Sequence, residues 1–151
     1  SINWPLGAAS YLLLPALGPI YATPADFADL PASGVTTLQQ ILLDDRLEFL
    51  RDPALAGSAQ AIAAFASLHI SMTFTAAVAA HLLGVGRRLR IALWAMFAVT
   101  LVNTVYLGWH YFVDNIAGVA IAVAALVIAR LLTGFELQSL RRAPHGEADP
   151  A

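Results

Sequence analysis

The stretch HYFVDNIAGVAIAVAALVIARLL, residues 110–132, decides the fold that the sequence predicts. A helix of this length reaches across the hydrocarbon core of a bilayer, and its charged residues, Asp114 and Arg130, lie toward its two ends. In a helix, His110 and Asp114 share a face one turn apart, so the carboxylate can hold one ring nitrogen while the other faces a substrate. Ionisable groups that enter an apolar run of a membrane protein are candidates for function. A buried polar pair that only packs is the alternative interpretation.

The composition indicates an integral membrane protein. Apolar residues make up 59% of the 151 residues and charged residues 12%, and the mean hydropathy is +0.71. The net charge of −2 and the absence of lysine leave no basic stripe, which argues against a nucleic-acid partner. There is no cysteine, so disulfides and thiolate chemistry are excluded. Histidines, carboxylates, arginines and hydroxyl groups remain as the reactive side chains.

Four apolar stretches predict an all-α, polytopic membrane helical bundle with four transmembrane helices, at residues 4–21, 58–83, 91–107 and 111–132. The first contains Pro15 and Pro19, and we expect its helix to fray near Pro15. The membrane-embedded domain then covers residues 1–142. The polar residues 143–151 predict a disordered tail, in which His145 is incidental.

A fifth helix is predicted at residues 36–50, where apolar residues recur at helical spacing after Thr36 or Thr37 as a possible N-cap. This amphipathic helix should lie at the membrane interface. Two of its cations, Arg46 and Arg51, could meet a substrate phosphate. The alternative is that they form surface ion pairs with the neighbouring acids Asp44, Asp45, Glu48 and Asp52.

Arginines predict the sidedness of the bundle. The short turn at residues 84–90 carries Arg87, Arg88 and Arg90, and such turns mark the cytoplasmic side. At the end of the fourth apolar stretch, Arg130 lies within it and Arg141 and Arg142 follow it, which agrees with this orientation. His81 lies at the same cytoplasmic end as the turn, as an interfacial or packing residue.

The same topology brings His69, His110 and Asp114 together at the extracytoplasmic end, beside two helix N-termini that favour an anion such as phosphate. A metal site of two histidines and one carboxylate is an alternative, but Asp114 is better placed as the partner of His110 than as a ligand. Ser67 lies two residues before His69 and so does not share its helical face, which argues against a serine-type triad. A proton pathway is disfavoured because the polar groups do not continue across the membrane.

Two motifs carry a family resemblance. FASLH at residues 65–69 and YLGWHYFVDNIAG at residues 106–118 resemble the second and third signature motifs of the type 2 phosphatidic acid phosphatase superfamily. The wording is closest to its inositol phosphorylceramide synthase-like branch, which reads Phe-Pro-Ser-Leu-His and His-Tyr-Phe-x-Asp-x-x-x-Gly. The similarity is loose over residues 10–133 and close in the two motifs.

The resemblance implies a role for each matching residue. His110 would attack phosphorus to form a phosphohistidine, and Asp114 would orient it. His69 would protonate the leaving alcohol and then activate the acceptor, and Ser67 would belong to the substrate-binding residues. The substrate would be a lipid or polyprenyl phosphate ester, with no metal and no cofactor. Water as the acceptor would make a phosphatase, and an alcohol such as inositol would make a phosphotransferase.

The sequence also departs from the superfamily. Its first motif, Lys-x6-Arg-Pro, is absent, and Thr104 stands where the broad superfamily has an arginine six residues before the nucleophile. The synthase-like branch also lacks this arginine, so Thr104 agrees with that branch and is counted among the substrate-binding residues. Arg46, Arg51 or a residue upstream of Ser1 could replace the missing phosphate-binding arginine. Six helices are usual in such families, so we expect two more upstream of Ser1. The lost motif keeps a second hypothesis open, a non-enzymatic membrane protein with a structural His/Asp network.

Overall fold

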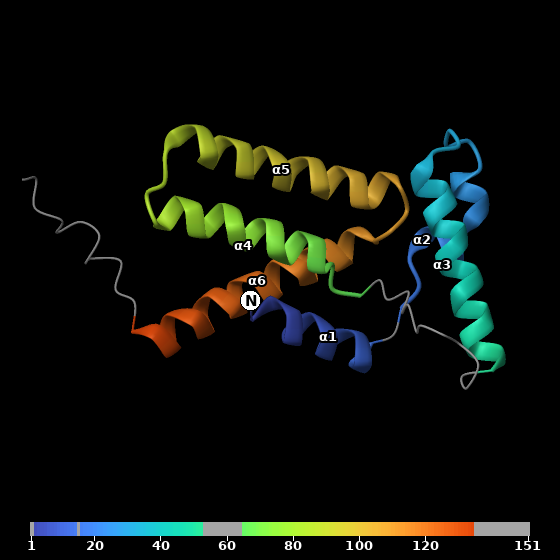
Figure 1. Ribbon diagram of the computed structural model, residues 1–151, viewed down its shortest axis with the longest axis horizontal. Coiled ribbons are helices and arrows are strands. Elements are labelled where there is room, and N and C mark those ends of the chain that lie inside the picture. Colours follow the sequence, from blue (N-terminus) through green and yellow to red (C-terminus); the bar gives the residue numbers. More distant parts are fainter. Residues whose placement is uncertain (1, 15, 53–64, 135–151) are drawn as a thin grey trace, which may run out of the picture.

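Six α-helices and one 3-10 helix make up the part of the chain that the computed structural model describes, residues 2–14, 16–52 and 65–134, and this part contains no strand (Figure 1). They are α1 (Asn3–Leu13), α2 (Pro19–Ala22), η1 (Pro24–Phe27), α3 (Gly34–Arg51), α4 (Leu68–Leu82), α5 (Arg87–Tyr106) and α6 (Phe112–Thr133). The all-α prediction is confirmed for these residues. The predicted tail at residues 143–151 lies outside them.

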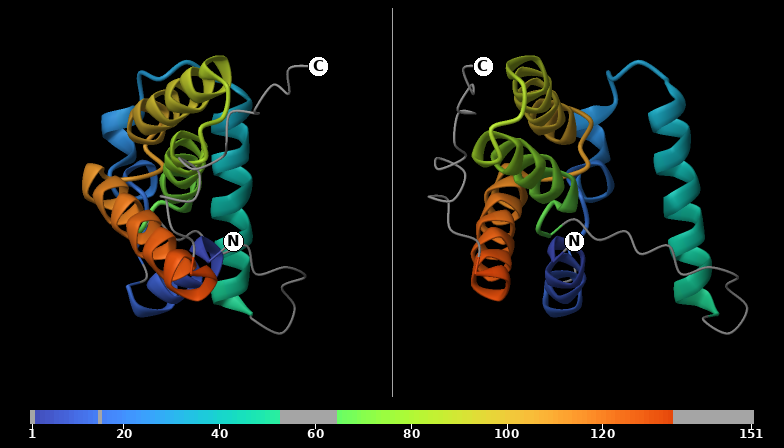
Figure 2. Two further views of the ribbon diagram at one scale, coloured as in Figure 1. Left: turned by 90° about the vertical axis from the view of Figure 1, so that its left-hand side faces the viewer. Right: turned by 60° about the vertical axis from the view of Figure 1, so that its left-hand side comes forward.

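Helix α4 is the centre of the bundle, because it packs against both α5 and α6, and α1 lies against α4 and α6. Helices α4 and α5 form an antiparallel hairpin, and α6 crosses beneath it (Figure 1). Helix α3 stands beside α2 at the end of the bundle where α5 turns into α6 (Figures 1 and 2). The starts of α4 and α6 therefore lie at one end, and the turn between α4 and α5 lies at the other.

Small residues fill the interior of this bundle, and large apolar side chains face outward. The buried apolar residues are one isoleucine and five alanines, Ile70, Ala66, Ala77, Ala80, Ala122 and Ala125. By contrast, Val102 and Leu131 are 64% and 76% exposed. Small residues let helices approach closely in membranes, where the apolar solvent tolerates large side chains outside.

A close approach of main chains joins the beginnings of α4 and α6. The Ser67 N–H donates to the Asp114 carbonyl oxygen at 3.1 Å. One turn further along α6, a Cβ added to Gly118 would lie 2.5 Å from the Ser67 carbonyl oxygen. Glycine at this position is therefore what lets the two helix starts come together.

Within the described residues, two helices, not the expected four, are long and apolar enough to cross a membrane. These are α5, with 20 residues, and α6, with 22, so the third and fourth predicted spans are confirmed as candidates. Helix α4 has 15 residues and α1 has 11, which at about 1.5 Å per residue falls short of the ~30 Å hydrocarbon core.

The predicted first span, residues 4–21, does not cross as one helix, and the expected fraying near Pro15 agrees with the end of α1. Helix α1 ends at Leu13, and a separate short helix, α2, begins at Pro19. Proline lacks an amide donor and disfavours helical geometry in the residue before it, so the sequence around Pro15 and Pro19 cannot continue α1. Residues 58–64 of the predicted second span lie outside the described residues, and α4 begins only at Leu68.

The predicted amphipathic helix is present as α3, but its N-cap is Ser33, not Thr36 or Thr37. The Ser33 N–H donates to the Thr36 hydroxyl oxygen at 2.7 Å, so Thr36 acts from inside the first turn. Leu38 and Ile41 on this helix are about half exposed. Its place at a membrane interface stays a prediction.

Gly118→Ala is expected to destabilise the protein by about 1–2 kcal/mol, because the overpacking of a backbone carbonyl outweighs the gain of about 1 kcal/mol from replacing a helical glycine. Thermal unfolding in detergent, followed by circular dichroism, measures the effect. Gly34→Ala is the matched control, since a Cβ there meets nothing within 4 Å. Equal stability of the two variants would contradict the close approach of α6 to Ser67.

Candidate active site

The loop between α5 and α6 positions His110. Helix α5 ends at Tyr106, and Gly108 turns the chain with a φ of 70°, which glycine adopts without strain. The His110 N–H then donates to the Thr104 carbonyl oxygen at 3.1 Å, and α6 begins two residues later at Phe112. His110 is therefore fixed by its own backbone just before the first turn of α6.

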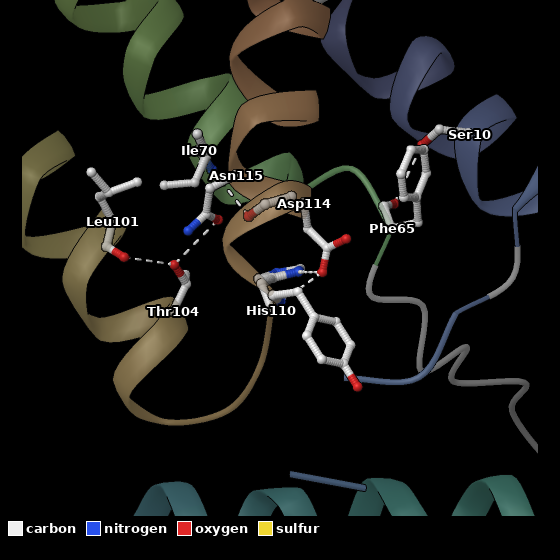
Figure 3. A network of polar contacts seen from close by, with 10 residues as sticks. Ser10, Phe65, Ile70, Leu101, Thr104, His110, Asp114 and Asn115 are labelled. Carbon is white, nitrogen blue, oxygen red and sulfur yellow. Dashed lines mark hydrogen bonds and ion pairs between the residues drawn. The ribbon is translucent and has the colours of Figure 1, made fainter. Parts of the chain in front are cut away.

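Asp114 lies beside the ring of His110 within the first turn of α6, and Figure 3 shows the two side chains facing each other. His110 Nδ1 and Asp114 Oδ2 are 3.9 Å apart, and the residues are only 6% and 2% exposed. The Tyr111 N–H donates to the same carboxylate oxygen at 2.8 Å and fixes its orientation. Because Asp114 takes the Nδ1 side of the ring, Nε2 lies on the side away from the carboxylate.

His69 occupies the first turn of α4 and comes from a distant part of the sequence. Its ring centroid is 6.2 Å from that of His110, with a 60° angle between the ring planes. Ser67 caps the helix by accepting the Ile70 N–H at 3.4 Å, and its own N–H binds the start of α6. His69 is exposed whereas His110 is buried. The predicted proximity of the two histidines is confirmed, and their chemical roles stay predictions.

Ala66, between Phe65 and the Ser67 cap, has a left-handed backbone with a φ of 56°. It is 1% exposed. This conformation costs a non-glycine residue about 1–2 kcal/mol. Proline, which stands here in the motif that FASLH resembles, fixes φ near −65°, so this chain enters α4 by a route that proline cannot follow.

Thr104 and Asn115 connect α5 and α6 beside the candidate site. The Thr104 hydroxyl contacts the Leu101 carbonyl oxygen at 3.1 Å and Asn115 Oδ1 at 3.4 Å, while the Thr104 carbonyl holds His110 (Figure 3). Thr104 thus joins α5, α6 and the loop that carries His110. The structure shows this contact set for Thr104, and its expected part in substrate binding stays a prediction.

Residues of α2 and α3 donate hydrogen bonds to the loop between α5 and α6 that carries His110. Gln39 Nε2 donates to the Leu107 carbonyl oxygen at 2.8 Å, and the Ile20 N–H donates to Gly108 at 3.0 Å. The Tyr21 hydroxyl donates to the Gln39 carbonyl at 3.2 Å. Burial raises the pKa of Tyr21, which keeps this donor protonated. The loop between α5 and α6 is therefore held by α5, through Thr104, and by α2 and α3, through Ile20 and Gln39.

Arg46 lies in α3, as predicted, and Arg51 is the last residue of this helix, one position beyond the predicted end. Gln39 makes the contact between α3 and the His110 loop, and the two arginines lie roughly 10 and 18 Å farther along the helix axis at about 1.5 Å per residue. Arg46 is half-buried and Arg51 is exposed. The structure thus brings His69, His110, Asp114 and Ser67 together, whereas the two arginines belong to a separate helix, α3.

Two residues of α1 near the site were not predicted. The Tyr11 hydroxyl interacts with the Leu68 backbone and lies close enough to feel the charge of Asp114. Asn3 is buried, and its amide nitrogen donates to the Ser71 carbonyl at 3.2 Å and the Thr75 hydroxyl at 2.9 Å. Only the packing of α1 on α4 and α6 reveals both residues, because neither lies in a motif.

The geometry defines an all-helical protein with two histidines and one aspartate at the joined starts of two helices. A family model of the PAP2 superfamily matches residues 1–128, and the chain therefore belongs to this superfamily. Its members are generally phosphatases that act on phosphate esters. No curated protein and no solved structure matches the chain.

Ala66→Pro is expected to destabilise the protein by about 2 kcal/mol or more, because proline cannot adopt the left-handed backbone at this position. Ala66→Gly is the control: it adopts the conformation freely, and the relief of strain offsets the lost methyl group to within about 1 kcal/mol. Denaturation in detergent compares the two variants. A proline variant as stable as the parent would contradict the left-handed entry to α4.

Proposed function

We propose that the protein is a multi-pass membrane phosphatase or phosphotransferase that acts on lipid or polyprenyl phosphate esters through a phosphohistidine. Membership of the superfamily supports phosphate-ester chemistry. The observation that carries the mechanism is the 6.2 Å separation of the His69 and His110 rings, with Asp114 beside Nδ1 of His110. His110 has a carboxylate beside one ring nitrogen to orient it, and His69 lies near enough to exchange a proton with a group bound at His110, which supports the roles of nucleophile and general acid.

In the first step, His110 Nε2 forms a bond to phosphorus while the bond from phosphorus to the alcohol oxygen breaks. His69 gives its proton to that oxygen, and Asp114 stabilises the positive charge on the His110 ring. In the second step, neutral His69 takes a proton from the acceptor, whose oxygen attacks phosphorus and releases His110. Water as the acceptor yields phosphate, and an alcohol yields a new phosphodiester or phosphomonoester. Neither step uses a metal.

The molecule that accepts the phosphoryl group from His110 distinguishes a phosphatase from a phosphotransferase. The motif wording supports the inositol phosphorylceramide synthase-like branch, in which an alcohol such as inositol would be the acceptor. Thr104 fits this branch, which lacks the arginine that the broad superfamily has at this position. Arg46 and Arg51 of α3 are the candidates for the cation that the phosphate then needs, together with the N–H groups at the start of α4.

The proposed active site faces the extracytoplasmic side. Arg87, Arg88 and Arg90 lie at the opposite end of the α4–α5 hairpin, and Arg130 lies near the end of α6 that points away from the histidines (Figure 1). Short arginine-rich turns mark the cytoplasmic side, which supports this orientation.

His110→Ala and His69→Ala should each lower turnover of labelled phosphatidic acid by about 10²-fold or more, because each removes a group that takes part in bond formation or proton transfer. With an aryl phosphate ester, whose leaving group needs no proton, His69→Ala should accumulate an acid-labile, alkali-stable phosphoryl-protein, and His110→Ala should form none. His145→Ala is the matched histidine control, and EDTA should not change the parent rate.

Activity of His110→Ala like that of the parent would overturn the assignment of the nucleophile. Failure to trap label on either the parent or His69→Ala, with helical content unchanged, would favour the non-enzymatic hypothesis of a structural His/Asp network.

Asp114→Asn should lower kcat by about 100-fold or more with little change in KM, because the amide keeps an oxygen for the Tyr111 N–H but no longer stabilises charge on the His110 ring. Steady-state kinetics with the same lipid measure the split. Asp45→Asn on α3 is the control for loss of one negative charge. A change in KM alone would show that Asp114 serves binding instead of catalysis.

A further inference from the structure

A second, cationic pocket lies at the end of the bundle opposite the histidines. Its volume is about 570 Å³, and it is lined by His81, Arg87, Arg90, Ile91, Trp94 and Ala95. On α4, His81 is twelve residues beyond His69, which places it roughly 18 Å away along the helix axis. The pocket is therefore separate from the proposed active site.

Among the described residues, no carboxylate is paired with the arginines of this pocket. Residues 53–113 contain no aspartate or glutamate. Within the described part of the chain, Arg87 and Arg90 form no ion pair with a carboxylate. Guanidinium groups bind phosphate oxygens in pairs of parallel hydrogen bonds, so two arginines one turn apart favour a phosphate group as the ligand.

The pocket continues as an apolar surface along α5. Ile91 and Trp94 in its wall are 57% and 38% exposed. Farther along the same helix, a second hollow of about 300 Å³ is lined by Ala98, Val99, Val102 and Asn103. These positions recur every three or four residues and share one face of α5. A free phosphate ion would use only the cationic end, whereas a lipid would use both parts.

We propose that this pocket binds an anionic phospholipid, with its phosphate on Arg87 and Arg90 and an acyl chain along the apolar face of α5. Trp94 lies between the two parts, where an indole ring suits the boundary between headgroup and chain. The lipid is a bound component of the cytoplasmic end, not the substrate. This inference shares the membrane setting of the proposed function but none of its chemistry.

Quenching of Trp94 fluorescence by brominated lipids tests the proposal. The protein carrying Trp4→Phe and Trp109→Phe retains Trp94 as its one tryptophan and is reconstituted in nanodiscs of phosphatidylcholine. Brominated phosphatidylglycerol should quench Trp94 at lower mole fractions than brominated phosphatidylcholine. Arg87→Gln and Arg90→Gln should each reduce this preference by about fivefold.

Arg88→Gln is the matched control, because Arg88 carries the same charge in the same turn but does not line the pocket. It should keep most of the preference. Equal quenching by the two lipids would overturn the proposal, and so would an equal loss in Arg88→Gln, which would indicate surface charge alone. Displacement of phosphatidylglycerol by millimolar inorganic phosphate would overturn the assignment to a lipid. None of these outcomes depends on turnover.

Discussion

The site depends on one backbone hydrogen bond, from the Ser67 N–H to the Asp114 carbonyl oxygen. This bond connects the residue that caps α4 to the first turn of α6, and the absent side chain of Gly118 allows the contact. Because His69 follows Ser67 and His110 precedes Asp114, this contact between main chains brings the two histidines to the same place. Their side chains need no direct bond to each other.

The two histidines have different surroundings, and this difference supports different roles. His110 is buried, held by the Thr104 carbonyl and bordered by Asp114, whereas His69 projects from the start of α4 and is exposed. Burial restricts a ring to one orientation, which suits an attacking atom. Exposure lets a ring exchange protons with a leaving group and an acceptor. Hydrogen bonds from Gln39 and Ile20 to the loop between α5 and α6 restrict the position of His110 further.

The bundle has two chemically distinct ends joined by apolar helices. The histidines and Asp114 lie at one end, and the arginines of the α4–α5 turn lie at the other. Between them, alanines and Gly118 make the helix contacts while large side chains such as Val102 face outward. This arrangement gives little burial of large apolar groups within the chain, so an apolar environment around α5 and α6 agrees with its packing.

The sequence by itself determined the helical class, the positions of α5 and α6, and the grouping of His69 with His110, because long apolar runs and arginine-rich turns depend on local composition. It indicated the break near Pro15 but did not determine the short α4 or the Ser33 cap, since helix ends depend on competing local contacts. Only the tertiary structure decided the left-handed Ala66, the support of His110 by Thr104, and the contact of Tyr11 with the start of α4. These features depend on contacts between segments that are distant in the sequence, and local sequence patterns do not predict such contacts.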